Sequence, residues 1–199
     1  MRENTKNNRQ TVPELMEEND VVDLLLRQHA MIRDLFDEVE NAPAGERAEP
    51  FQRLVRLLAV HETAEEEVVH PYARRKINGG EDVVEDRLAE ENEAKQLLMR
   101  MDKAGAGDPQ FLIHLATLRA AVTAHARAEE RYEFTQLRSQ TSEAERRTLA
   151  AGVKAAEALA PTHPHPGVES ATKNLLVGTP LAMMDRARDV IRKAMGREN

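Results

Sequence analysis

The sequence predicts an all-α protein: an antiparallel, up-down-up-down four-helix bundle with an additional C-terminal helical extension. Long stretches rich in Leu, Ala, Glu and Arg, which are good helix formers, lie between short segments that contain Gly and Pro. Within these stretches apolar residues recur at steps of three and four, and strand-like alternation is absent. Because the connections between the stretches are short, neighbouring helices are expected to run antiparallel.

The Gly and Pro segments set the expected helix boundaries. We expect a polar N-terminal tail over residues 1–18, followed by a bundle over residues 19–140. The four helices of this bundle are expected near residues 19–41, 47–77, 81–104 and 109–140. The segments that separate them are Pro43–Gly45, Gly79–Gly80 and Gly105–Pro109.

The remaining residues, 141–199, are expected to form the helical extension. A fifth helical stretch is predicted near residues 142–160, followed by a linker with alternating Pro and His at 161–167. Thr179 and Pro180 then resemble the N-cap and first turn of a last helix. The apolar face of that helix, Leu181, Met184, Ile191 and Met195, needs a surface to cover it, which is the bundle, a second copy in a homodimer, or a protein partner.

Composition excludes several classes of site and partner. The 199 residues include 41% hydrophobic residues, enough for one core, and no cysteine, so a bound metal must use nitrogen and oxygen ligands. The net charge is −7 with the two signs interleaved, which disfavours nucleic acid and membrane surfaces as partners. The opening residues are polar and no apolar run is long enough to span a bilayer, so we expect a cytoplasmic protein.

The chain contains an internal repeat of a helical hairpin. The segment DVVDLLLRQHAMIRDLF at 20–36 aligns without a gap with DVVEDRLAEENEAKQLL at 82–98, which sets Glu91 opposite His29. Likewise, HETAEEEVVHPYAR from His61 aligns with HARAEERYEFTQLR from His125. Two such hairpins packed face to face would bring their matched polar residues around a pseudo-two-fold axis at the bundle centre.

Polar residues interrupt each inward apolar face near mid-helix. In chain order they are His29, then His61 and Glu65, then Glu91, then His125 and Glu129. Residues four apart on a helix share a face at about 5–6 Å, which suits two ligands of one metal or a carboxylate that bridges two metals. Glu62 is a further candidate, rotated by about 100° from His61.

A metal explains the buried carboxylates better than a structural network does. An ionised Glu91 in an apolar face costs several kcal/mol unless a cation meets it, and Arg33 and Lys95 are expected only at the margins of their faces. If four glutamates ligate (Glu62, Glu65, Glu91 and Glu129), their charges cancel those of two divalent ions, with three neutral histidines as further donors. Mixed imidazole and carboxylate donors favour two iron ions, oxo- or hydroxo-bridged when oxidised, over manganese. A hydrogen-bonded network without metal remains the alternative.

This pattern resembles the hemerythrin-like (HHE cation-binding) family of bacterial non-haem di-iron bundles, over about residues 20–138; the tail also resembles those of actinobacterial members. The resemblance implies metal roles for His29, His61, Glu65, His125 and Glu129, with Glu65 and Glu129 as bridges. The chain departs from the family at Glu91, where a histidine is usual. His61, Glu62 and Glu65 together also resemble the His-Glu-x-x-Glu of an iron-sensing domain in a ubiquitin-ligase subunit.

The expected function is that of a di-iron protein that binds or reacts with O2, H2O2 or NO in a redox-stress or sensing role. Catalase-like peroxide disproportionation is an enzymatic variant, and no catalytic residue is assigned. The alternative is an iron-sensing or interaction module that metal binding orders.

Three further side chains are assigned from helical register alone. Tyr72 and Tyr132 are expected to face inward beside the metal ligands, and the alternative for both is a core aromatic near the bundle end. His70 is expected on the face opposite His61, at the surface.

Overall fold

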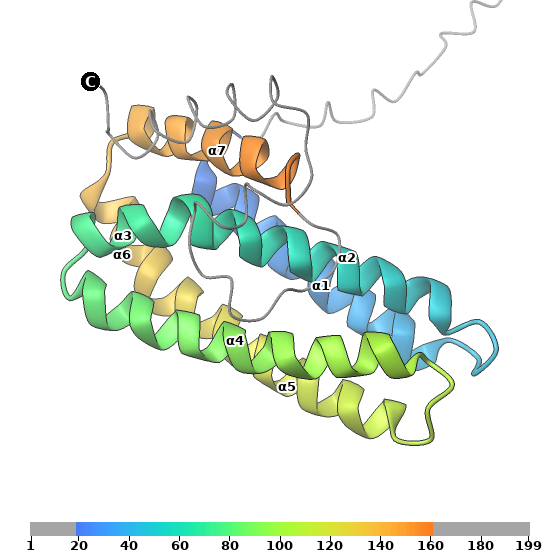
Figure 1. Ribbon diagram of the computed structural model, residues 1–199. Coiled ribbons are helices and arrows are strands. Elements are labelled where there is room, and N and C mark those ends of the chain that lie inside the picture. The colour runs from blue at the N-terminus through green and yellow to red at the C-terminus, as the bar shows by residue number, and fades with distance from the viewer. Residues whose placement is uncertain (1–18, 161–199) are drawn as a thin grey trace, which may run out of the picture.

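Four long helical segments run antiparallel in the computed structural model, which describes residues 19–160 (Figure 1). In chain order the elements are α1 (Val21–Asn41), α2 (Ala48–Ala64), η1 (Glu65–Val69), α3 (His70–Lys76), α4 (Gly80–Ala104), α5 (Phe111–Ala128), η2 (Glu129–Glu133), α6 (Phe134–Gln140) and α7 (Glu143–Glu157). The described residues contain no β-strand. The predicted all-α bundle with a further helix is therefore confirmed. The expected tail at 1–18, the linker at 161–167 and the last helix with its dimer or partner surface lie outside the described residues.

Local side chains and glycines fix the ends of the helices. The Asp20 carboxylate accepts a hydrogen bond from the Val22 amide at 2.9 Å and caps α1. Gly79, with φ of +66°, provides the left-handed turn between α3 and α4. A Cβ at the next residue, Gly80, would lie 2.5 Å from the Ala73 carbonyl oxygen, so the close return of the chain requires glycine there as well.

Two apolar clusters fill the bundle, one on each side of its centre. The first includes Leu25, Val84 and Phe134, and the second includes Phe36, Leu98 and Phe111. On α1, His29 lies between Leu25 of the first cluster and Ile32 of the second. Burying each large apolar side chain stabilises the fold by roughly 1.5–3 kcal/mol. The polar centre is thus held in place by an apolar core on both sides.

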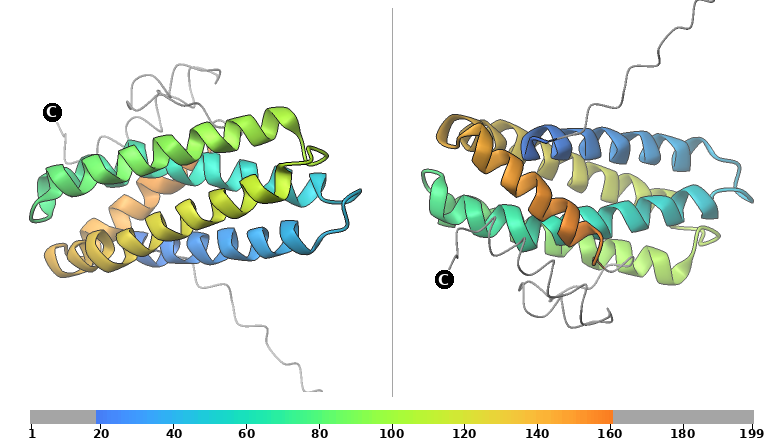
Figure 2. Two further views of the ribbon diagram at one scale, coloured as in Figure 1. Left: turned by 90° about the horizontal axis from the view of Figure 1, so that it is seen from below. Right: turned by 90° about the horizontal axis from the view of Figure 1, so that it is seen from above.

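The fifth helix, α7, lies obliquely across one face of the bundle (Figure 2). It contacts α1, α2 and η1, and it buries Leu149, Ala150, Val153 and Ala156. Ser142 and Glu145 form a capping box at its start. α7 corresponds to the helical stretch predicted near residues 142–160.

Two π-helical turns, η1 and η2, interrupt the helices that were expected to be continuous over 47–77 and 109–140. Each begins at the glutamate of a His-x-x-x-Glu pair, at matched positions of the repeat. A π turn contains one residue more than an α-helical turn, so it rotates every later side chain by about 100° relative to an unbroken helix. This rotation changes which residues beyond Glu65 and Glu129 face the bundle centre.

Within residues 19–160, none of the helices has the length and apolar character that crossing a lipid bilayer would require.

Candidate metal centre

The predicted histidines and glutamates converge at the centre of the bundle and are all buried. They are His29 on α1, His61 and Glu62 on α2, Glu65 on η1, Glu91 on α4, His125 on α5 and Glu129 on η2. Two sets of ligand atoms each fall within 4.8 Å of one another. One set is His29, His61, Glu65 and Glu129, and the other is Glu65, His70, Glu91 and Glu129. The two sets share Glu65 and Glu129, so each of these carboxylates could serve a cation held by either set.

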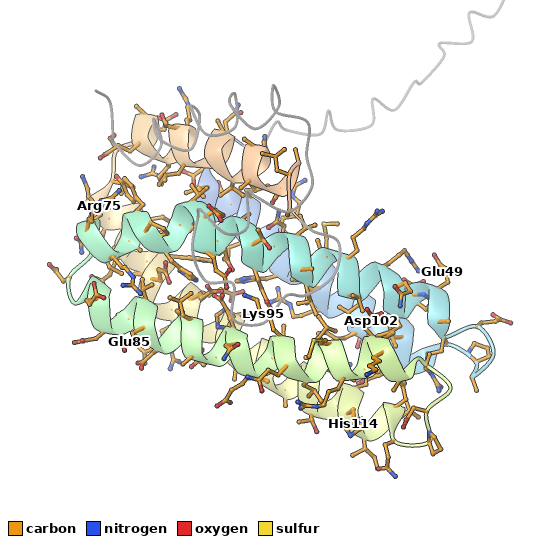
Figure 3. All side chains as sticks on the ribbon, viewed as in Figure 1. Glu49, Arg75, Glu85, Lys95, Asp102 and His114 are labelled. Atoms are coloured by element: carbon orange, nitrogen blue, oxygen red, sulfur yellow. The ribbon has the colours of Figure 1, made fainter. Side chains whose placement is uncertain are left out.

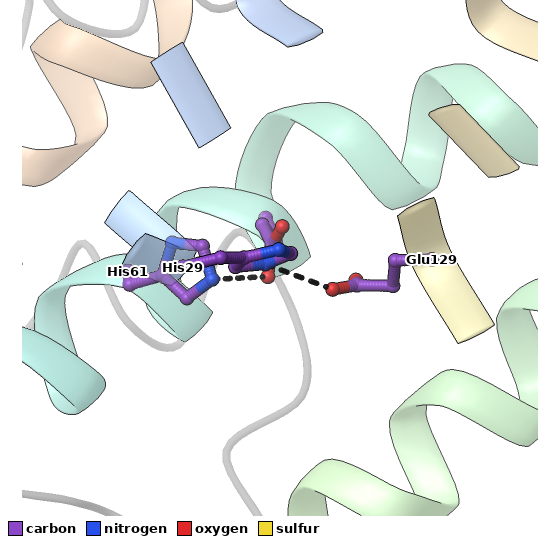
Figure 4. Close-up of side chains that lie close together, drawn as sticks. His29, His61 and Glu129 are labelled. Atoms are coloured by element: carbon purple, nitrogen blue, oxygen red, sulfur yellow. Dashed lines mark ion pairs between the residues drawn. The ribbon is translucent and has the colours of Figure 1, made fainter. Parts of the chain in front are cut away.

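The imidazole Nε2 atoms point at carboxylate oxygens. The distance is 3.3 Å from His29 Nε2 to Glu129 Oε2, 3.3 Å from His61 Nε2 to Glu65 Oε2, and 3.4 Å from His125 Nε2 to Glu129 Oε1. Figure 4 shows His29 and Glu129 directed toward each other, with His61 alongside. The Nε2 atoms of His29 and His125 and both oxygens of Glu65 and Glu129 form no hydrogen bond within the protein. This arrangement of nitrogen and oxygen donors fits a shared cation.

The opposite nitrogen of each of these rings has a hydrogen-bond partner. Nδ1 of His29 lies 2.9 Å from Glu130 Oε1, and Nδ1 of His61 lies 2.7 Å from Gln28 Oε1. His125 makes the same kind of contact, at 3.1 Å, with Glu90 Oε2. In the neutral ring, an Nδ1–H that donates outward leaves the Nε2 lone pair facing the centre, which is the arrangement that metal-binding histidines usually have.

Burial and neighbouring charges shift the pKa values of these groups strongly. Burial lowers the pKa of His61 to about 3, so its ring is neutral at physiological pH, as a ligand must be. Burial opposes the charge of Glu129, but His125 and His29 outweigh it and hold that pKa well below its usual range. Burial, and next the charge of Glu129, raise the pKa of Glu65 well above normal. A cation between Glu65 and Glu129 would offset the desolvation cost of the two carboxylates and the repulsion between their charges.

Lys95 is nearer to the centre than the sequence predicted. Its side chain is buried; Nζ contacts the Glu66 carboxylate and lies 3.6 Å from Glu91 Oε2 and 3.8 Å from Glu62 Oε2. Sequence register placed Lys95 only at the margin of its helix face, and the structure shows that its side chain nevertheless reaches Glu91. Glu62 belongs to neither set of donors, and burial raises its pKa to about 8 despite Lys95. The metal interpretation accordingly depends on Glu65 and Glu129 more than on Glu91.

His70 was expected at the surface, and this assignment was also wrong. The π turn η1 rotates α3 so that His70 is buried, with Nε2 2.6 Å from Glu91 Oε1 and Nδ1 3.3 Å from Glu133 Oε1. Glu133, likewise missed, is fully buried. Helical register alone gave no signal for either residue, because the π turn that brings them inward has no marker in the sequence.

The two tyrosines point away from the donors. The Tyr72 hydroxyl donates a hydrogen bond to Glu145 on α7 at 2.9 Å, and Tyr132 is 56% exposed because η2 turns Glu133 inward in its place. Neither tyrosine therefore lies beside the candidate donors, in contrast to the expectation from helical register. His114 lies near the start of α5, well separated from the centre, as its spacing from His125 requires (Figure 3).

A small cavity adjoins the three histidines of α1, α2 and α5. Its volume is about 20 Å³, and its walls are largely apolar. The lining includes Ile32, Phe36, Leu58 and Val122 together with His29, His61 and His125. A cavity of this size has room for a molecule about as large as water.

Comparisons with known proteins agree with this geometry. The family model described as the hemerythrin HHE cation binding domain matches residues 20–137. An uncharacterized hemerythrin-like protein of Schizosaccharomyces pombe is 24% identical over 176 residues, which cover 87% of each chain. A DNA nickase of Nostoc sp. is 27% identical over 138 residues, which cover 69% of this chain but only 39% of the nickase. No solved structure matches significantly.

Proposed function

This chain belongs to the hemerythrin HHE cation-binding family, and from that premise we propose that it is a non-haem di-iron protein. In this proposal its buried centre binds or reacts with O2, peroxide or NO in a redox-stress or sensing role. The observation that carries the proposal is the pair of donor sets that share Glu65 and Glu129. Two adjacent positions, each with imidazole and carboxylate donors, suit two iron ions better than one.

Each donor residue has a distinct place in this proposal. His29 and His61 would hold one ion, and Glu91 and His125 the other, with Glu65 and Glu129 between them. Iron bound at these positions supplies redox and Lewis-acid chemistry toward small oxygen and nitrogen species. The buried surroundings keep bulk water from the donors. The outward hydrogen bonds of Nδ1 fix the orientation of the imidazole rings.

The cavity beside the histidines supports a small substrate. With largely apolar walls and room for a molecule about as large as water, it suits O2, NO or peroxide. Catalase-like turnover needs no external reductant, because one peroxide is oxidised to O2 while a second is reduced to water. The site is therefore compatible with both reversible binding and peroxide disproportionation.

A second candidate function is an iron-sensing module that metal binding orders. The observation that favours it is a hydrogen-bonded path from the centre to the fifth helix. The Gln28 amide accepts from His61 Nδ1 and donates to Glu157 near the end of α7. Loss of metal would thus destabilise the packing of α7 on the bundle, because metal binding contributes folding free energy.

Elemental analysis of tag-free protein, expressed with ample iron and purified without chelator, tests the di-iron proposal. We expect close to two irons per chain. His125→Gln should lose iron, whereas His114→Gln, the same substitution on the same helix away from the centre, should retain it. A metal-free wild type after attempted iron reconstitution would refute the proposal.

Two further measurements on the loaded protein separate the candidate functions. Oxygen release from added peroxide would identify catalase-like turnover, and its absence would eliminate that variant. For the sensing function, the melting temperature should fall sharply on iron removal. Equal melting of the loaded and metal-free protein would refute an iron-ordered module.

A further inference from the structure

We propose that His70 is a ligand of the second metal position and replaces the histidine that α4 lacks at Glu91. This inference rests on the di-iron function proposed above. It adds a nitrogen donor that a regular helix would place on the face opposite His61, away from the bundle centre. It also assigns Glu133 as the carboxylate that orients the His70 ring.

The internal repeat shows which position of the second pair carries a histidine. His29 of the first repeat corresponds to Glu91 of the second, and His70 corresponds to Phe134. His29 stacks on Phe134 with ring centroids 5.5 Å apart, and Glu91 contacts His70 at 2.6 Å. Each pseudo-symmetric pair therefore contains one imidazole. In the first pair it comes from the first helix of a hairpin, and in the second pair from the second helix.

The surroundings of His70 are those of a ligand for the second position. A ring nitrogen lies within 4.8 Å of ligand oxygens from Glu65, Glu91 and Glu129. His125 Nε2 approaches the same position, 3.8 Å from Glu91 Oε1 and 3.4 Å from Glu129 Oε1. With His70 included, each of the two cation positions has two imidazole donors and the same two carboxylates between them.

Glu133 is the hydrogen-bond partner of His70 Nδ1, as Glu130, Gln28 and Glu90 are for His29, His61 and His125. Its Oε1 lies 3.3 Å from His70 Nδ1, while Nε2 is directed to Glu91 at the centre. Unlike Glu90 and Glu130, the partners of His125 and His29, Glu133 is fully buried. A carboxylate held there fixes the ring orientation and the tautomer that leaves Nε2 available to a metal.

The competing interpretation is that His70 only donates a hydrogen bond to Glu91 and never contacts metal. Iron content and the number of coordinated imidazoles distinguish the two. The imidazoles can be counted from outer-shell scattering in the X-ray absorption spectrum of iron-loaded full-length protein. We expect two irons ligated by four imidazoles in the wild type. Wild type with two irons but three imidazoles would overturn the role of His70, whereas wild type with one iron would overturn the di-iron function on which it rests. Wild type without iron would also overturn the proposed function.

Variants provide the second arm of the test. His70→Gln should lose one imidazole signal and about half of the iron, and His114→Gln should lose neither. Glu133→Gln should retain His70 scattering but bind iron roughly 10–100-fold more weakly, as expected when the partner of a ligand is removed. Two irons with unchanged imidazole scattering in a folded His70→Gln protein would refute the inference. Should that variant not fold, the wild-type imidazole count decides alone.

Discussion

Replacement of Lys95 by Met tests how the protein tolerates its buried carboxylates. The Lys95 ammonium contacts Glu66 and lies within 4 Å of both Glu62 and Glu91, and all four side chains are buried. Met is close to Lys in shape, so the change removes the charge with little loss of packing. The expected effect is a loss of stability in chelator-treated protein that grows as the pH rises.

The size of this effect follows from the pKa values of the partners. Removing one member of a buried ion pair commonly costs about 3–5 kcal/mol. Protonation limits the cost here, because burial already raises the pKa of Glu62 to about 8 and that of Glu66 to about 7. Each further unit of pKa is worth about 1.4 kcal/mol. We therefore expect a loss of about 3 kcal/mol at neutral pH, or a melting temperature lower by about 6–12 °C.

The sign of the pH dependence follows from the raised pKa values. The folded protein holds protons on Glu62 and Glu66 that the unfolded chain releases near its ordinary pKa, so stability falls as the pH rises from there through about 7 and 8. Without Lys95 the folded pKa values rise further, and the fall continues to higher pH. The difference between wild type and Lys95→Met should thus grow from about pH 6 to about pH 9.

Urea denaturation followed by circular dichroism at these two pH values provides the measurement. Arg119→Met is the matched control, because Arg119 also pairs with two carboxylates, Asp37 and Glu40, but at the surface. It should cost no more than about 1 kcal/mol at either pH. A Lys95→Met protein that loses less than its control, or loses the same amount at both pH values, would refute the reasoning.

Two further predictions concern contacts made by α7. Gln28→Leu removes the acceptor of His61 Nδ1 and the link to Glu157, and should weaken iron binding roughly 10–100-fold in competition with a chelator; unchanged affinity would exclude a positioning role. Glu145 is held by Lys76, Ser142 and Tyr72, which lower its pKa to about 2. Its contribution to stability is complete above the ordinary pKa of 4.5 and is lost as the pH falls toward 2, so Glu145→Gln should flatten the acid limb of the stability curve; an equally steep limb would contradict this.

Sequence spacing predicted those donors that precede the π turns or stand at their first residue. His61 and Glu65 are four residues apart and meet across a single turn, as do His125 and Glu129, because both pairs end where a π turn begins. His29 and Glu91 occupy matched positions of the repeat, and both reach the centre. The bundle itself could be predicted because its apolar periodicity is regular.

The residues beyond the π turns could not be predicted from a period of 3.6 residues. In an unbroken helix His70 would face away from the donors, Glu133 would lie at the margin of their face, and Tyr132 would face toward them. One inserted residue reverses these assignments, and no single residue type marks a π turn in a sequence. The contacts of Lys95 with the buried carboxylates were not predicted for another reason. Its long side chain reaches inward from the margin of the helix face.

The two π turns also explain why the centre is asymmetric although the chain is a repeat. Both turns bring the residue nine positions beyond a histidine toward the axis, and these residues are His70 in one repeat and Phe134 in the other. Phe134 packs on His29 and belongs to the first apolar cluster. His70 instead joins Glu91 on the side that carries Lys95. The same backbone device therefore produces one apolar and one ionic side. The difference between the two sides thus comes from the residue that follows each π turn, Phe134 in one repeat and His70 in the other.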